Sequence, residues 1–169
     1  MSNPLPCPAC GAPLGGRAGC QAAFDELSAG AWTSSARGAV HNLVVDAYSM
    51  QHPEDYGRSA KSYAAHLTGL CCGVELGGDA RIYWAIPRWL DGAAAPAKPP
   101  LIVSRGVLTI AHVRSARGDA EHGERVRAWA ASVWEAYASQ QDVARAWLRA
   151  AAGGSLPAHG GRERRTPSS

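Results

Sequence analysis

The sequence has no long apolar run, and this absence excludes one class of protein. Its longest uncharged apolar stretches, such as AVHNLVV, fall well short of the roughly 18 residues that a membrane-spanning helix needs. The start, MSNPLPCPAC, also lacks a charged segment followed by an apolar run. We therefore expect no secretory signal, no membrane partner and a cytoplasmic location.

The chain also has little net charge where a nucleic-acid surface would need it. The total is +3, from 17 basic and 14 acidic residues. Residues 153–169 hold three arginines and one glutamate, which leaves 14 basic and 13 acidic residues, or +1, for the body. Because a duplex-binding protein needs a basic face on its folded part, this balance argues against nucleic acid as a partner. The Gly/Pro/Ser-rich segment 153–169 is predicted to be a disordered basic tail, with a basic contact arm as the alternative.

The familiar catalytic signatures are missing as well. The sequence contains no nucleophile elbow, no His-Glu-x-x-His and no dinucleotide-binding glycine pattern. GLCCGVELGG lacks the Lys-Ser/Thr ending of a phosphate loop. Any chemistry must therefore come from side chains that the fold brings together.

Helical periodicity dominates what is present. With 46% hydrophobic residues in 169, the chain can bury a core, and we predict one domain over residues 1–152. Apolar residues at helical spacing predict helices over 20–31, 38–52, 59–73, 79–90, 119–140 and 141–152. The β-branched run LIVSRGVLTIAHV predicts one or two short strands. The expected fold is thus a mainly α, compact helical domain with one minor β feature; the six tryptophans belong to its core or line a pocket for a planar ligand.

The N-terminal segment CPACGAPLGGRAGC predicts a knuckle-like metal site. Cys7-x2-Cys10 lets two sulfurs face one ion, and Gly11 lets the backbone fold beneath them. Cys20, at the predicted start of a helix, is a natural third ligand because a helix N-terminus favours a thiolate. An odd cysteine count and two close pairs argue against a disulfide framework, so zinc is the expected cofactor.

The fourth ligand is left open by the sequence. Cys71 is taken as the candidate, because it lies on the inner face of its predicted helix; a simple buried cysteine is the equal alternative. The other choices are Cys72 and the histidines at 41, 52 and 66. A closed set of four protein ligands would be structural, whereas a missing ligand would leave a catalytic position.

A second set of titratable residues follows the knuckle. His41, Tyr48 and His52 lie along one side of a predicted helix, and Asp46 points roughly 140° away from His41. Two antiparallel helices could bring His52, His66 and Tyr48 together as a metal site or an acid–base group. The catalytic candidates are therefore His52, His66, Tyr48, His41 and Asp46. The alternative is that they are hydrogen-bonded side chains between helices.

Several segments together resemble a bacterial domain family of unknown function. They are CPACGA with Cys20 and Phe24, VDAYSMQHP, KSYAAHLTGLC, RWLDG and SVWEAYA, and the resemblance covers nearly the whole body from Cys7 to about Trp147. The family brings no activity with it. It implies only site positions: Cys7, Cys10, Cys20, His41, Asp46, His52, His66 and Cys71. Gln140-Gln141 stand where some relatives are expected to carry a histidine.

Two functions remain open. One is a zinc-dependent enzyme that acts on a small-molecule substrate, with a histidine moving protons. The other is a non-catalytic, zinc-stabilised binding or interaction domain. The sequence does not indicate an oligomeric state.

Overall fold

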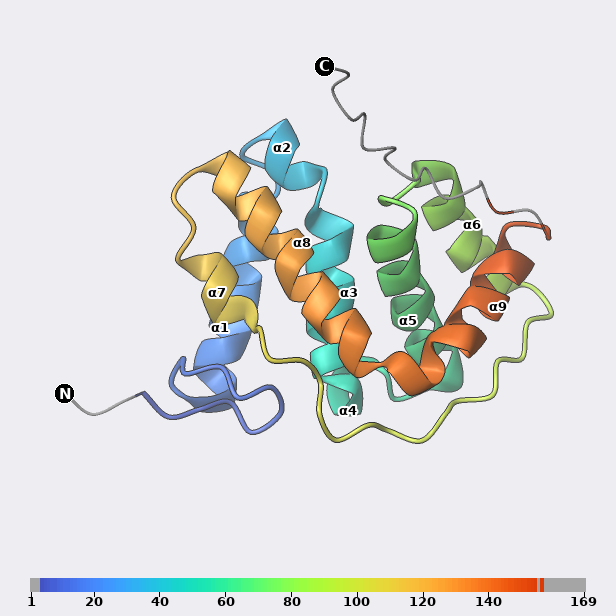
Figure 1. The fold of residues 1–169 in the computed structure, drawn as a ribbon, viewed down its shortest axis with the longest axis horizontal. Coiled ribbons are helices and arrows are strands. Elements are labelled where there is room, and N and C mark those ends of the chain that lie inside the picture. The colour runs from blue at the N-terminus through green and yellow to red at the C-terminus, as the bar shows by residue number, and fades with distance from the viewer. Residues whose placement is uncertain (1–3, 155, 157–169) are drawn as a thin grey trace, which may run out of the picture.

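Helices form the regular structure of the computed structural model, which describes residues 4–154 and 156 (Figure 1). The mainly α prediction is confirmed. The elements, in chain order, are α1 (Gly16–Gly30), α2 (Ser35–Gly38), α3 (His41–Gln51), α4 (Pro53–Tyr56), α5 (Ala60–Glu75), α6 (Ala80–Asp91), α7 (Ile110–Arg114), α8 (Asp119–Ala136), the 3-10 turn η1 (Ala138–Gln140) and α9 (Gln141–Ala151).

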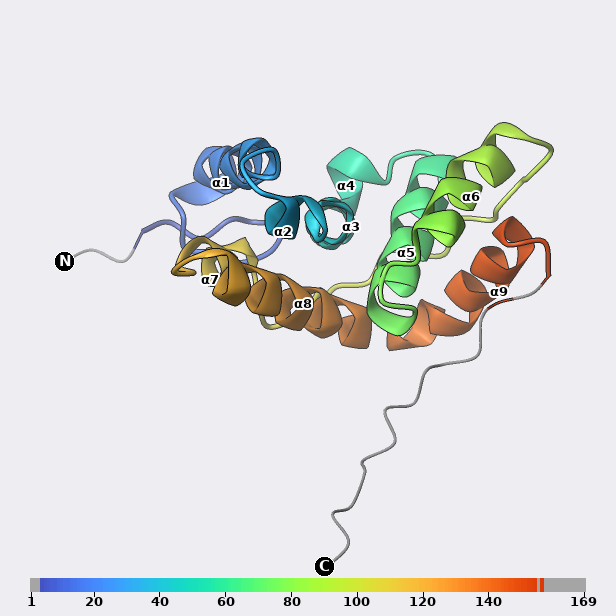
Figure 2. The same cartoon turned by 90° about the horizontal axis from the view of Figure 1, so that it is seen from above.

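Helix α3 lies at the centre of this arrangement. It packs against α5 on one side and against α8 on another, and α1 also contacts it. In Figure 2, α7 and α8 lie along the lower edge of the molecule with α1 to α4 above them, and α5, α6 and α9 lie together at the right. Because residues of α3 therefore face several neighbours, this helix can supply side chains to more than one site.

The core between these helices is rich in aromatic residues. Trp129, Tyr48, Tyr63 and Tyr137 are fully buried. The tryptophans divide between core and surface: Trp129 and Trp134 are buried, whereas Trp32 and Trp84 are 87% and 71% exposed. The expectation that tryptophans build the core is thus met for only some of them.

Local sequence signals explain where the helices begin. Ser59 starts α5: its side chain accepts a hydrogen bond from the Ser62 amide, and the Ser62 hydroxyl accepts one from the Ser59 amide. The Asp79 carboxylate caps α6. Pro53 ends the preceding helix as predicted but also opens the short helix α4, where its missing N–H costs nothing. Pro87 lies inside α6, and the helix continues past it to Asp91.

The predicted strands within residues 101–113 are wrong. This stretch is an irregular loop followed by α7, and Val103 is 98% exposed. Its backbone groups are taken by side chains instead of by a second strand: the Ser132 hydroxyl accepts hydrogen bonds from the amides of Val107 and Leu108. Among the described residues, the β feature is a single antiparallel bridge between Pro6 and Pro13, inside the knuckle.

Two buried glutamines fasten the long connection at residues 92–109 to the helices. The Gln51 amide donates to the carbonyls of Arg105 and Leu108, at 2.9 Å each, and accepts from the Trp129 indole at 3.0 Å. Gln140 accepts from the Tyr63 hydroxyl at 2.7 Å and donates to a carbonyl of the loop at 2.8 Å. Gln140 therefore has a structural role at the position where a histidine was expected in relatives.

Two further predictions concern membrane-spanning helices and the C-terminal tail. Within the described residues, no helix combines the length and apolar character needed to cross a membrane. The predicted tail at 153–169 lies outside the described residues except for Gly153, Gly154 and Leu156, so the boundary at residue 152 stays a prediction.

Candidate metal centre

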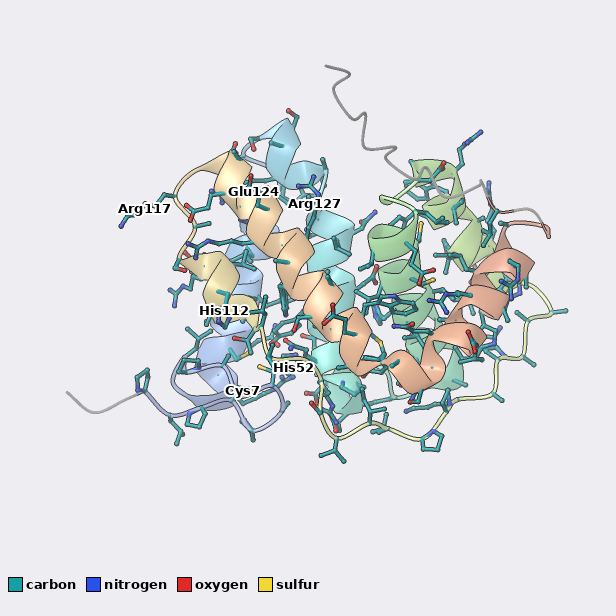
Figure 3. All side chains as sticks on the ribbon, in the orientation of Figure 1. Cys7, His52, His112, Arg117, Glu124 and Arg127 are labelled. Atoms are coloured by element: carbon teal, nitrogen blue, oxygen red, sulfur yellow. The ribbon has the colours of Figure 1, made fainter. Side chains whose placement is uncertain are left out.

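Four metal-ligating side chains meet beneath the N-terminal knuckle. They are Cys7, Cys10, Cys20 and His52, and their three sulfurs and one ring nitrogen all lie within 4.8 Å of one another. The His52 Nε2 is 3.6 Å from the sulfurs of Cys7 and Cys20, and the sulfurs of Cys10 and Cys20 are 3.7 Å apart. Figure 3 shows Cys7 and His52 at the lower edge of the molecule, where the knuckle meets α1 and α4. This donor set could hold one metal ion.

The knuckle backbone presents two of these sulfurs. The Cys7 amide donates to the Ala12 carbonyl at 2.8 Å, and the Gly11 amide donates to the Cys7 carbonyl at the same distance. Gly11 has φ +78°, a conformation that only glycine adopts without strain, so the predicted role of this residue is met. The closed turn turns the sulfurs of Cys7 and Cys10 toward the helices.

Cys20 comes from α1, although not from its first turn. The helix begins at Gly16, four residues earlier than predicted, so Cys20 lies in the second turn. The argument that a helix N-terminus stabilises its thiolate therefore does not hold. The case for Cys20 as a ligand depends instead on its position: it is fully buried, and its sulfur contacts both Cys10 and His52.

His52 lies between α3 and α4 and is fully buried. Its Nδ1 is 2.7 Å from the Tyr48 carbonyl, which can only accept a hydrogen bond, so Nδ1 carries the proton. The lone pair of the neutral ring is then on Nε2, the nitrogen that faces the sulfurs. The Tyr48 ring packs on the imidazole at 4.0 Å and stacks on Phe24 at 4.1 Å, which holds the histidine in place.

The thiols of this group do not titrate independently. A hydrogen bond from Cys20 lowers the pKa of Cys10, and the same contact raises the pKa of Cys20. One proton therefore lies between the two sulfurs, and the anionic form of Cys10 is favoured. A divalent cation would replace that proton and stabilise both thiolates.

A cationic side chain lies next to the sulfurs. Arg17 of α1 forms an ion pair with Asp55 of α4. Burial lowers the pKa of Arg17, yet the nearby acidic groups raise it above its usual value; these are Tyr48, Asp55 and Cys7. Three thiolates around a divalent ion would carry one net negative charge, which the Arg17 guanidinium can offset.

The structure places Cys71, the predicted fourth ligand, elsewhere. Its sulfur lies in α5, 3.8 Å from the Glu75 carboxylate, and does not belong to the group around His52. Cys72 is likewise buried, with its sulfur 3.8 Å from the Asp79 carbonyl. Burial raises the pKa of both thiols to about 12, so both stay protonated as small apolar side chains. These two residues match the buried-cysteine alternative.

The predicted histidine cluster is divided by the structure. His52 and Tyr48 contact each other, but the His66 Nδ1 donates to the Asp46 carboxylate at 2.9 Å. Asp46 thus serves a contact away from His41, as the helical angle predicts, and the Tyr83 hydroxyl donates to its second oxygen at 2.7 Å. The buried Nδ1 of His41 has no hydrogen-bond partner among the described residues.

Tyr83 is a member of this second group that the sequence analysis did not identify. The sequence pattern predicts this segment as a helix over residues 79–90 and assigns it no functional side chain. A signal was available, because Asp46 lies among apolar residues of α3 and a buried carboxylate needs donors from the helices that cover it. The phenol of Tyr83 is one such donor in the segment DARIYWAIPRWL.

Comparison with known proteins supports the resemblance seen in the sequence. The model of a family of unknown function, DUF5946, matches residues 5–138, and the chain belongs to this family. No curated protein matches the chain. No solved structure matches it either.

Proposed function

We propose that Cys7, Cys10, Cys20 and His52 bind one zinc ion and that this zinc is structural. The chain would then be a zinc-stabilised helical protein in which the metal joins the knuckle to α1 and α3. The observation that carries the proposal is the arrangement of three sulfurs and one imidazole nitrogen around a common centre.

The distances support a tetrahedral site. Two sulfurs bound at about 2.3 Å to one zinc ion lie about 3.8 Å apart, and a sulfur and an imidazole nitrogen lie about 3.5 Å apart. Three of the six separations are close to these values: 3.7 Å between Cys10 and Cys20, and 3.6 Å from His52 to Cys7 and to Cys20. The other three are no longer than 4.8 Å. Three thiolates and a neutral imidazole also suit zinc better than the hard cations, which prefer oxygen ligands.

The number and burial of the ligands support a structural role. Four protein ligands complete the coordination that zinc adopts in closed sites and leave no position for a substrate. Cys7, Cys20 and His52 are buried, and only Cys10 is partly exposed. Residues 4–15, the described part of the segment before α1, have one β-bridge as their regular structure, so this segment would gain its shape from a bound ion.

The alternative, a zinc-dependent enzyme, requires a ligand to leave or a water to enter. His52, first considered as an acid or base, cannot move protons while its Nε2 binds zinc and its Nδ1 binds the Tyr48 carbonyl. The partly exposed Cys10 is the one ligand that a substrate could displace. The closed arrangement favours the non-catalytic function.

Metal analysis of variants tests the proposal. Protein purified with zinc should contain one equivalent per chain, and Cys20→Ser and His52→Ala should lose most of it. Cys71→Ala is the matched control, because it removes an equally buried thiol outside the group and should keep the full equivalent.

Cobalt substitution then separates the two functions. A closed site of three sulfurs and one nitrogen gives the intense visible absorption of tetrahedral cobalt(II). Full zinc binding by Cys20→Ser, or a cobalt spectrum of higher coordination, would contradict the structural site and favour the enzyme.

A further inference from the structure

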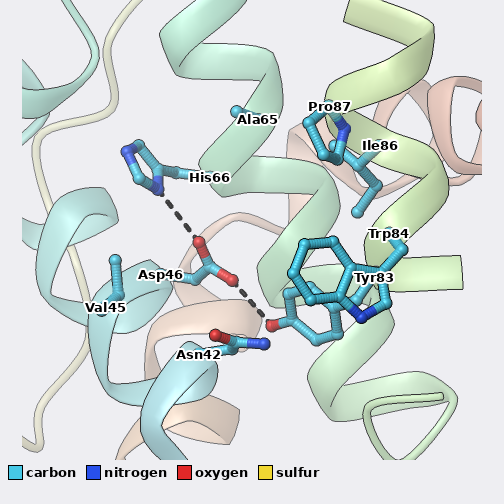
Figure 4. A pocket seen from close by; sticks show the side chains of 9 residues that line it. All are labelled: Asn42, Val45, Asp46, Ala65, His66, Tyr83, Trp84, Ile86 and Pro87. Carbon is cyan, nitrogen blue, oxygen red and sulfur yellow. Dashed lines mark hydrogen bonds and ion pairs between the residues drawn. The ribbon is translucent and has the colours of Figure 1, made fainter. Parts of the chain in front are cut away.

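A groove between α3, α5 and α6 contains a set of groups that the proposed zinc site does not use. Its cavity measures about 280 Å³, at the lower edge of the range for small-molecule sites. Asp46, His66 and Tyr83 line it together with Asn42, aliphatic residues and the Trp84 indole (Figure 4).

The ionisable centre of the groove is a buried carboxylate. Asp46 is only 6% exposed and accepts hydrogen bonds from the His66 Nδ1 and the Tyr83 hydroxyl. Gly69 of α5 makes room for it, because a Cβ atom there would overlap the Asp46 carboxylate. The close packing of α3 on α5 thus places the Asp46 carboxyl group at the base of the groove, where His66 and Tyr83 satisfy it.

The charged side chains that line the groove disfavour an anionic ligand. No lysine or arginine is among the lining residues of this cavity, so its one formal charge, apart from the titratable His66, is negative. The His66 Nε2 has no hydrogen-bond partner among the residues that the structure describes. A cationic ligand near Asp46 would therefore be attracted by the carboxylate, and no lysine or arginine of the lining would repel it.

The walls provide a surface for the rest of a ligand. Val45, Ala65, Ile86 and Pro87 are apolar, and the Trp84 indole lies across the groove beside Tyr83 in Figure 4. Trp84 is 71% exposed although it belongs to a pocket wall. An aromatic face beside a carboxylate is the combination that recognises organic cations, because both attract positive charge and the ring also packs on hydrocarbon.

We propose that this groove binds a small organic ammonium ion, with its charged nitrogen toward Asp46 and its hydrocarbon part against Trp84 and the aliphatic wall. His66 and Tyr83 position the carboxylate. The site is separate from the zinc ligands, so ligand binding and zinc binding can be measured independently.

Benzylamine, which is protonated at neutral pH, is a suitable probe, and benzyl alcohol is its uncharged counterpart of nearly the same shape. Titration of the zinc-loaded full chain, followed by two-dimensional amide NMR, should show saturable shifts in α3, α5 and α6 with benzylamine. Benzyl alcohol should bind about tenfold more weakly or worse. Equal binding of the two probes would overturn the proposal, because charge would then play no part.

Paired tryptophan variants provide the second test. Trp84→Ala should weaken benzylamine binding by about three- to thirtyfold. Trp32→Ala removes an even more exposed indole, from the connection between α1 and α2, and should change nothing. Both residues are exposed, so both variants should fold and retain zinc. Unchanged binding by Trp84→Ala would overturn the proposal.

Discussion

The two histidine sites of this protein differ in the group that holds each ring. The His52 Nδ1 donates to the Tyr48 carbonyl, which directs Nε2 toward three sulfurs. The His66 Nδ1 donates to a carboxylate, and the His66 side chain lines an open groove. The first ring completes a closed donor set, whereas the second leaves a position for an outside molecule. The orienting partner thus separates a structural histidine from one that can serve a ligand.

Metal removal should produce the largest difference between the two regions. A chelator should lower the melting temperature by on the order of 10 °C, because structural zinc sites contribute several kcal/mol to folding. Circular dichroism with and without chelator measures the change. The Trp84→Ala variant, altered only in the groove, should show the same loss. A melting temperature unaffected by the chelator would remove the reason for calling the metal structural.

The two histidines should respond differently to the same substitution. His52→Ala should reduce bound zinc from one equivalent toward zero, since it removes one of four ligands. His66→Ala should keep one equivalent, since its ring contacts Asp46 instead. Elemental analysis of both purified variants gives the answer. Zinc lost from His66→Ala, or retained in His52→Ala, would mean that the two sites have been assigned the wrong way round.

A substitution at Gly69 should disturb the groove without touching the knuckle. Gly69→Ala places a methyl group against the Asp46 carboxylate, and we expect a loss of about 1–3 kcal/mol in the free energy of unfolding. Gly123→Ala is the matched control: it also lies within a helix, but its nearest neighbour is the flexible tip of Arg127. Denaturant titration should find the control neutral or slightly stabilised. Equal effects would show that Asp46 does not restrict this position.

The smallest effect concerns pH. Burial raises the pKa of Asp46, although hydrogen bonds from His66 and Tyr83 act in the opposite direction. The folded state therefore holds this proton more tightly than the unfolded state, and stability falls as pH rises from about 4 through the folded pKa. The Asp46→Asn variant has no carboxyl group at this position, so this contribution to the pH dependence of stability is absent from it.

The stability of the wild type relative to Asp46→Asn should accordingly decrease as pH rises over that window. Because both proteins carry the same zinc ligands, the pH dependence of metal binding cancels in the difference. Denaturant titrations of both proteins at several pH values measure it. A difference that grows in favour of the wild type would show that the hydrogen bonds outweigh burial.

Local patterns predicted most of the fold. The apolar spacing on α3 and α5 and the cap at Ser59 depend on neighbouring residues, so the helices appear at nearly the predicted places. The strands predicted in residues 101–113 failed because their backbone partners are distant side chains such as Ser132. Such long-range partners cannot be read from β-branched composition.

The sequence predicted only those ligands of the candidate site that lie close together in the chain. Cys7-x2-Cys10 is visible as a motif, and Cys20 follows in the same segment. The fourth donor depends on where α3 ends relative to the knuckle, and periodicity places Cys71 and His52 equally well on inner faces. The tertiary packing distinguishes them: the His52 Nε2 lies 3.6 Å from two of the sulfurs, whereas the Cys71 sulfur contacts Glu75.

X-ray absorption spectroscopy of the zinc-loaded protein tests the metal assignment most directly. The account predicts three sulfur ligands at about 2.3 Å and one nitrogen at about 2.0 Å. Four sulfurs would restore Cys71 as a ligand, and additional oxygen ligands would show an open site. Either result would contradict the closed site of Cys7, Cys10, Cys20 and His52.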